Sequence, residues 1–195
     1  MVEKVASLDP VSEGLRPSFA EVALPHLDAA YNLAHWLTRN DIDAADVVQE
    51  ACLRALTYFD GYRGENGRAW LLTIVRNTCH LWIQRNRPAT DVEFSSDVEN
   101  EVENAAIECG TPTPVPEAVL LQEGASRLLN ELIAALPHPF REVLVLRELE
   151  DMSYREISDV LGMPTGTIMS RLARARGLLK DAWARRNRSG ANHGM

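Results

Sequence analysis

The sequence predicts an all-α protein in which two small helical domains are joined by a flexible acidic linker. Apolar residues recur at helical spacing through residues 19–87 and again through residues 120–185. Between them, residues 88–119 contain four prolines and a stretch with seven acidic and no basic side chains. Such a composition is typical of a segment without a packed core. A predicted helix-turn-helix lies at residues 153–180, and tails are expected at residues 1–18 and 186–195.

Residues 19–58 are predicted to form the first two helices. Pro25 is expected to break or kink the first helix, over residues 19–38, because proline cannot donate a helical hydrogen bond. After a turn at Asn40 and Asp41, the second helix is expected to begin at Asp43, a candidate N-cap. Its expected buried stripe is Val47, Ala51, Ala55 and Tyr58. The opposite side carries Asp46, Gln49 and Glu50, which alone would be a solvated acidic face.

A loop at residues 59–67 contains three glycines and leads into a third helix, predicted over residues 68–85. Two aromatic residues of the loop either offer a base-stacking surface or attach the loop to the core, and composition favours neither. Trp70 is expected to be a core anchor that fixes this loop. His80 is expected on the surface, and since no second ligand lies at metal-binding spacing, no metal site is predicted.

The C-terminal domain is organised around the helix-turn-helix. Ser153 and Glu156 have the spacing of a capping box, and Gly162 and Pro164 end the helix that they begin. Thr165 is expected to cap the second helix, whose buried stripe is Ile168, Leu172, Ala175 and Leu179. A separate seam of the same helix carries Thr167, Ser170, Arg171 and Arg174. A second helix that presents hydroxyls and guanidiniums on one side is typical of a DNA reader.

The charge distribution supports a nucleic-acid partner although the net charge is −8. Residues 165–188 carry seven Arg or Lys side chains and one Asp, so this end is strongly basic. No apolar run is long enough for a transmembrane helix, and no signal peptide is recognisable. Cys52, Cys79 and Cys109 form no Cys-x-x-Cys pair and fit a reducing cytoplasm, with Cys109 a candidate reactive thiol. No nucleophile–base pair or phosphate loop is present, so neither an enzyme nor a cofactor is predicted.

Four stretches in order carry a family resemblance. They are Asp46-Val-Val-Gln-Glu-Ala, Arg68-Ala-Trp-Leu-Leu-Thr-Ile-Val-Arg-Asn-Thr, Leu136-Pro-His-Pro-Phe-Arg-Glu-Val-Leu, and the helix-turn-helix itself. Together they resemble a bacterial RNA polymerase sigma factor of the extracytoplasmic-function (ECF) group of the sigma-70 family. That group consists of region 2 and region 4 joined by a linker, and the resemblance covers residues 19–87 and 120–183.

The resemblance implies three sets of contact residues. Docking on the clamp helices of the largest polymerase subunit is implied for Asp46, Gln49 and Glu50. Recognition and melting of the promoter −10 element is implied for Arg63, Asn66, Arg68, Arg76, Asn77, Arg85 and Arg87. Reading of the −35 element in the major groove is implied for Thr165, Thr167, Ser170, Arg171, Arg174 and Arg176. Region 4 is also expected to bind the flap of the second-largest subunit.

The resemblance further implies a cytoplasmic transcription initiation factor that responds to stress and is controlled by an anti-sigma factor. Its linker is expected to thread toward the polymerase active centre. Because that linker is long, we expect no fixed interface between the two domains, so a partner could clamp them together.

Two departures from the family and two rival functions accompany this interpretation. Met169 stands where relatives often carry a basic residue, so the −35 DNA sequence that this chain recognises cannot be inferred from theirs. The loop around Tyr62 is shorter than in some relatives. A free-standing helix-turn-helix regulator would need a dimerising or ligand-binding domain, which residues 19–87 do not resemble. A decoy that mimics region 4 would lack the basic seam and the acidic docking motif, and this chain has both.

Overall fold

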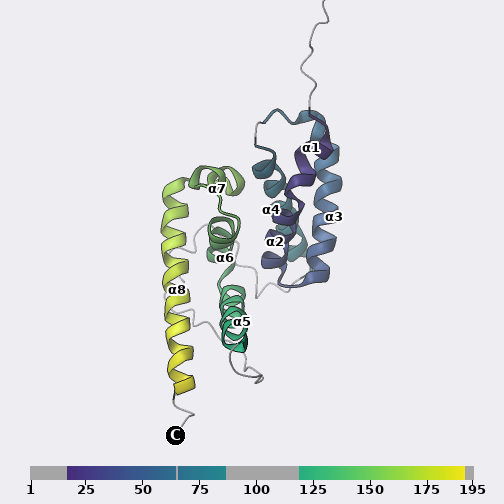
Figure 1. Ribbon diagram of the computed structural model, residues 1–195. Coiled ribbons are helices and arrows are strands. Elements are labelled where there is room, and N and C mark those ends of the chain that lie inside the picture. The colour runs from purple at the N-terminus through teal and green to yellow at the C-terminus, as the bar shows by residue number, and fades with distance from the viewer. Residues whose placement is uncertain (1–16, 65, 87–118, 192–195) are drawn as a thin grey trace, which may run out of the picture.

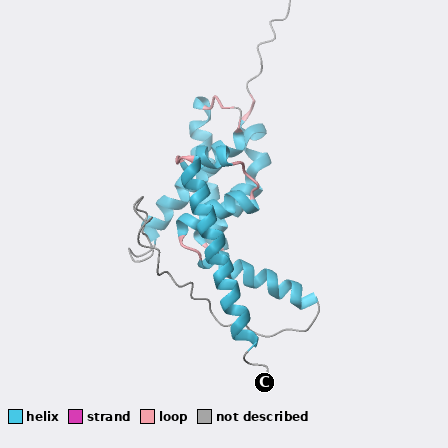
Figure 2. Cartoon of the chain, turned by 90° about the vertical axis from the view of Figure 1, so that its left-hand side faces the viewer, coloured by secondary structure: helices cyan, strands magenta, loops and turns pink. Residues whose placement is uncertain are grey.

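The computed structural model describes residues 17–64, 66–86 and 119–191, and within these ranges the chain forms only helices, turns and loops (Figures 1 and 2). The first half contains α1 (Phe19–Ala23), α2 (Leu27–Thr38), α3 (Asp41–Tyr58) and α4 (Gly67–Asn86), with short 3-10 turns η1 (Leu24–His26) and η2 (Phe59–Gly61). The second half contains α5 (Val119–Ala135), α6 (His138–Leu144), the π-helical turn η5 (Val145–Leu149), α7 (Tyr154–Leu161) and α8 (Thr165–Ala191). The all-α prediction is confirmed.

Local sequence signals explain most helix boundaries of the first half. Pro25 lies in the 3-10 turn that separates α1 from α2, as expected. The expected start of the second helix at Asp43 is wrong, because α3 begins at Asp41. Its N-cap is Asn40, whose Oδ1 accepts hydrogen bonds from the backbone N–H groups of Ile42 and Asp43. Tyr58 was expected in the buried stripe but is 64% exposed at the end of the helix.

The predicted capping box of the second half is present. The Ser153 Oγ accepts from the Glu156 N–H at 3.2 Å, and a Glu156 carboxylate oxygen accepts from the Ser153 N–H at 2.9 Å. Gly162 ends α7 in the left-handed conformation, with φ of 65°, which favours glycine. The prediction of Thr165 as a cap is wrong by one residue, because α8 begins at Thr165 and the Pro164 carbonyl accepts from the Ile168 N–H.

The C-terminal helix is longer than expected. It continues to Ala191, so part of the tail predicted at residues 186–195 is helical. The predicted linker lies almost wholly outside the described residues, as do Arg87 and Cys109. None of the described helices is both long and apolar enough to cross a membrane.

Each half has an apolar core, which contains many residues of the predicted stripes and others, such as Leu33 and Leu72, that were not predicted. In the first half, α2, α3 and α4 pack against one another through fully buried residues such as Leu33, Leu37, Val47 and Leu72. In the second half, α6 and α7 pack on α8, whose Ile168, Leu172 and Ala175 are buried as predicted. The predicted helix-turn-helix therefore has the expected apolar seam.

The two halves also pack against each other, which the sequence did not predict. α7 contacts α4 and α6 contacts α2, so segments on either side of the linker lie side by side (Figure 1). Buried apolar residues of both halves join in a single cluster. The expectation that no fixed interface exists between the domains is wrong for this arrangement, which we call the closed arrangement.

Candidate polymerase and promoter interfaces

The side of α3 that carries the acidic residues is open to solvent. Asp46 and Gln49 are exposed, and Glu50 is half-buried with its Oε1 accepting from the Arg54 Nε at 3.1 Å. Leu53 and Leu56 continue this surface along the helix and are 62% and 55% exposed. Sequence reasoning missed these two leucines, although Leu53 follows Glu50 by three residues and Leu56 follows Leu53 by three, which is the spacing of one side of a helix. Exposed apolar residues beside charges are typical of a docking surface.

The loop that follows α3 is held by aromatic contacts. The Phe59 ring meets Phe19 edge-on at 5.6 Å and stacks on Tyr62 at 5.9 Å, and the Tyr62 ring lies 4.9 Å from Trp70. Trp70 is partly buried against the core and contacts the loop, in agreement with its expected role as an anchor. The loop aromatics therefore attach the loop to the core.

The same aromatics also line a surface cavity of about 240 Å³. Its walls are Pro17, Phe59, Asp60, Tyr62, Arg63 and Gly64. The Arg63 Nη1 donates to the carbonyls of Asp60 and Tyr62 at 2.6 and 2.9 Å, which keeps the loop in shape. A concave site with aromatic walls and a cation at its rim can accept an unstacked base.

Asn77 lies far from this cavity. It is exposed on α4, ten residues after Gly67. At 1.5 Å of rise per residue, the two positions are about 15 Å apart along the helix. A single base is too small to contact both the cavity and Asn77. Arg85 is exposed further along the same helix.

Three other residues of the predicted −10 set are engaged by the second half of the chain. The Arg76 Nε donates to Glu142 Oε1 at 2.6 Å, and the Arg68 Nη2 donates to Glu150 Oε2 at 2.7 Å. The Asn66 Nδ2 donates to Glu156 Oε1 at 2.9 Å. Each of these three donors therefore has a carboxylate of the second half as its partner.

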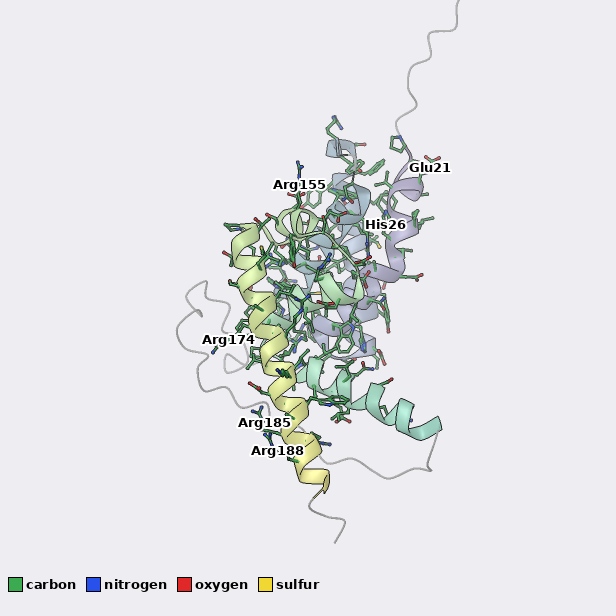
Figure 3. The ribbon with its side chains drawn as sticks, turned by 60° about the vertical axis from the view of Figure 1, so that its left-hand side comes forward. Glu21, His26, Arg155, Arg174, Arg185 and Arg188 are labelled. Atoms are coloured by element: carbon green, nitrogen blue, oxygen red, sulfur yellow. The ribbon has the colours of Figure 1, made fainter. Side chains whose placement is uncertain are left out.

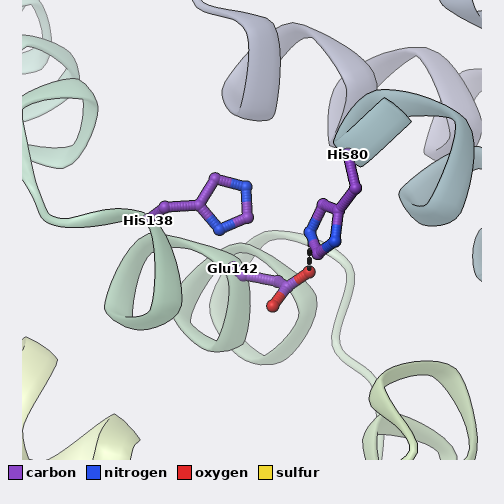
Figure 4. Close-up of side chains that lie close together, drawn as sticks. All are labelled: His80, His138 and Glu142. Atoms are coloured by element: carbon purple, nitrogen blue, oxygen red, sulfur yellow. Dashed lines mark ion pairs between the residues drawn. The ribbon is translucent and has the colours of Figure 1, made fainter. Parts of the chain in front are cut away.

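Glu142 is the most buried of these carboxylates, with 2% of its side chain exposed. The His80 Nε2 lies 3.4 Å from Glu142 Oε1, and the His138 ring approaches from the same helix as Glu142 (Figure 4). Burial opposes ionisation of Glu142, but hydrogen bonding to His80 and the charges of its neighbours outweigh it and hold its pKa at about 2. Burial lowers the pKa of His138 to about 3, against the opposing effect of Glu142.

The polar seam of α8 faces outward. Thr165, Ser170 and Arg174 are exposed, whereas Thr167 and Arg171 are half-buried. Arg174 projects away from the helix in Figure 3. Arg176 is also exposed, but its Nε donates to Glu148 Oε1 at 3.1 Å. The seam opposite the buried stripe is thus available to a DNA groove, as the helix-turn-helix requires.

Comparison with known proteins identifies the family to which this chain belongs. The model of sigma-70 region 2 matches residues 23–88, and the model of sigma-70 region 4 matches residues 126–179. The ECF RNA polymerase sigma-E factor of Haemophilus influenzae is 33% identical over 155 residues, which are 76% of this chain and 78% of that protein. Its Escherichia coli counterpart is 34% identical over 137 residues, or 69% of this chain and 70% of that protein. The chain belongs to the ECF group of sigma-70 family sigma factors.

A solved structure agrees with this assignment. The sigma factor RpoE of Bartonella quintana, in complex with the anti-sigma factor NepR, superposes with a TM-score of 0.59 at 25% identity, covering 83% of this chain and 93% of that chain. CnrH, solved with the cytosolic domain of CnrY, shares the fold with a TM-score of 0.55 at 24% identity over 85% of this chain and 87% of that chain. The resemblance predicted from the sequence is confirmed. Sigma factors initiate transcription and are not enzymes.

The closed arrangement affects the predicted sites of this sigma factor unequally. The acidic face of α3 and most of the polar seam of α8 remain exposed, whereas Asn66, Arg68 and Arg76 are in contact with region 4. The predicted docking residues lie together on α3, and the predicted −35 residues lie together on α8. The predicted −10 residues divide between the loop, the exposed side of α4 and the interdomain contact.

Removing the Arg76 charge should open the closed arrangement. Arg76→Met leaves the buried Glu142 carboxylate without its guanidinium, and breaking a buried pair by deleting one partner costs about 3–5 kcal/mol. We expect small-angle scattering of the free protein to show a larger radius of gyration. Arg54→Met removes an ion pair within α3 and is the control, which should leave the radius unchanged. An unchanged radius for Arg76→Met would show that this pair does not hold the domains together.

Proposed function

We propose that this ECF sigma factor docks on core RNA polymerase through α3, reads the −35 element with α8, and captures the melted −10 strand with α4 and its preceding loop. The observation that carries the proposal is the split surface of α8, where Ile168 and Leu172 are buried while Ser170 and Arg174 are exposed. Region 4 must present such a seam to enter a major groove. The unstacked base is assigned to the cavity at Tyr62 and Arg63, with Asn77 contacting a different nucleotide.

Transcription in vitro with core enzyme tests the proposal directly. Purified protein should make core polymerase initiate at a cognate promoter that core enzyme alone does not use. A free-standing regulator would instead bind promoter DNA tightly without polymerase, and a decoy would do neither. If the protein bound promoter DNA without polymerase and did not support initiation when polymerase was present, it would be a free-standing regulator and the proposed function would be wrong.

We infer that the closed arrangement is not the form that melts promoters. Arg68 and Arg76 each have a region 4 carboxylate as partner, so the strand can gain these contacts only after the domains separate. Desolvation offsets much of the attraction in a buried ion pair, and both groups regain water on opening. The exchange of a carboxylate for a phosphate therefore requires little net free energy.

A protein partner is needed for full inhibition, because the closed arrangement leaves Asp46 and Gln49 exposed. A structural relative is itself found with an anti-sigma factor. We propose that an anti-sigma protein covers the α3 face of this chain, that release follows a stress signal, and that the cycle takes place in the cytoplasm where polymerase works.

Charge reversal on α3 should weaken polymerase binding. Asp46→Ala and Glu50→Lys remove or invert charges on the exposed face, which lowers the association rate with a basic partner surface. Affinity for core enzyme, measured by fluorescence anisotropy, should fall while helix content is unchanged. Asp28→Lys makes the same reversal on α2 and should have no effect. Equal affinity for Glu50→Lys and wild type would make this face ordinary solvated helix.

Arginine truncations on α8 should weaken promoter use in two different ways. Arg174→Ala should cost about 1–3 kcal/mol and relax specificity at one −35 position, as expected for a base contact. Arg171→Ala should weaken all sequences alike, as expected for a phosphate contact. Lys180→Ala, further along the helix, is the control. Transcription from a panel of −35 variants measures both effects, and identical profiles for the two arginine variants would refute the assignment.

Asn77→Ala should impair open-complex formation without affecting the fold or polymerase binding, since this side chain is exposed. Its amide can both donate to and accept from a base edge. Permanganate footprinting should show less melting on linear promoter DNA, and a pre-melted bubble should restore the part of the defect that lies in melting. Gln84→Ala is the control on the same helix. Normal transcription by Asn77→Ala on both templates would mean that the loop around Arg63, and not Asn77, captures the strand.

A further inference from the structure

We propose that His80, His138 and Glu142 form a binding site for a divalent transition metal, with zinc as the best match, between regions 2 and 4. The three side chains come together only in the closed arrangement (Figure 4), because His80 lies on α4 and the other two on α6. The site lies apart from the acidic face of α3, the loop cavity and the polar seam of α8. Binding of polymerase or promoter is not needed to form it.

The spacing of the three residues suits a metal. His138 and Glu142 are four residues apart on α6, so their side chains project from the same side of the helix. One ligand atom from each of the three residues lies within 4.8 Å of the other two. Donor atoms around a tetrahedral zinc ion are roughly 3.3 Å apart, as follows from bond lengths near 2.0–2.1 Å. The His80 Nε2 and Glu142 Oε1 are already 3.4 Å apart, so small side-chain rotations complete the geometry.

The donor set selects the kind of ion. Two imidazoles and one carboxylate are typical zinc ligands and leave a fourth position for water, whereas magnesium and calcium prefer oxygen ligands alone. Only 17% of the His80 side chain and 2% of the Glu142 side chain are exposed, so the ion would be largely shielded from water. A surface cluster of acidic residues would have neither feature.

Arg76 places a positive charge next to the proposed metal site. Its Nε donates to Glu142 Oε1 at 2.6 Å, so the ion is expected to use another lone pair of this oxygen while Arg76 keeps its hydrogen bond. Outer hydrogen bonds of this kind orient ligating carboxylates in metal sites. The positive guanidinium also repels the metal cation. The affinity for the metal therefore depends on how far binding to the two imidazoles outweighs this repulsion.

Metal binding at this site would oppose separation of the two domains. Because region 2 supplies one ligand and region 4 supplies two, separation of the domains destroys the site. An ion that binds only the closed arrangement favours it by a factor of 1 + [metal]/Kd. This consequence rests on the proposed function, in which opening precedes promoter melting. Metal binding itself does not rest on it.

The test uses the full-length chain without a histidine tag. Zinc is titrated against a chromophoric chelator, and cobalt is used to record visible absorption bands of a four-coordinate site. His80→Gln and Glu142→Gln are compared with His35→Gln, which alters a histidine lying 2.8 Å from the carboxylate of Asp41 outside the cluster. Circular dichroism confirms that each variant is folded. If Glu142→Gln does not fold, the half-buried position of His80 makes His80→Gln the decisive variant.

We expect one zinc equivalent in the wild type and in His35→Gln. His80→Gln should bind about 100-fold more weakly or worse, since even outer-shell substitutions cost 10–100-fold. Equal affinity in His80→Gln and wild type, or no zinc bound by the wild type, would overturn the site.

Scattering and transcription assays test the coupling to opening. Zinc should reduce the radius of gyration of the wild type and repress its transcription, but have neither effect on His80→Gln. If zinc bound but changed neither the radius of gyration nor transcription, the coupling between metal binding and domain opening would be wrong, and the metal site itself would stand. Failure to initiate on any promoter while zinc still binds would overturn the proposed function alone.

Discussion

The Glu142 carboxylate lies between regions 2 and 4, and a buried carboxylate has to be neutralised by its neighbours. The nearest arginine in its own helix is Arg141, but the Nη1 of that residue donates to the backbone carbonyls of Ala134 and Leu136. The counter-charge at 2.6 Å is Arg76 of region 2. A charge in region 4 is therefore satisfied by the other domain, and this ion pair joins α6 to α4 beside the shared apolar cluster.

The same contact links the closed arrangement to nucleic-acid binding. Arg68 and Arg76 each donate a charge-assisted hydrogen bond to a carboxylate of region 4, and guanidinium groups form such bonds to phosphates as well. Under the proposed function, region 4 and the promoter strand compete for one set of donors. Since neither state leaves the guanidiniums buried without a partner, opening exchanges one anion for another, and the balance between the two states can be moved by small changes in charge.

How much the sequence could predict depended on the distance over which each signal acts. The Ser153–Glu156 capping box and the glycine at the end of α7 depend on residues three to six positions apart, and both are present as predicted. The start of α3 was misplaced because Asn40 and Asp43 are both competent N-caps and only the folded chain shows which one is used. Contacts between Arg76, His80 and Glu142 join distant segments, and no spacing rule connects them. His80 was assigned to the surface because the side of α4 that it occupies is polar, yet that side faces region 4.

In the proposed function, the closed arrangement blocks one step of initiation and not the others. The acidic face of α3 and the exposed residues of the α8 seam lie outside the interdomain contact, so closure alone does not cover the surfaces proposed for polymerase docking and for the −35 element. What it covers is the part of α4 that would hold the melted strand, through Arg68 and Arg76. In the proposed function, a second protein keeps this sigma factor from polymerase by covering the α3 face, where Leu53 and Leu56 lie beside the acidic residues.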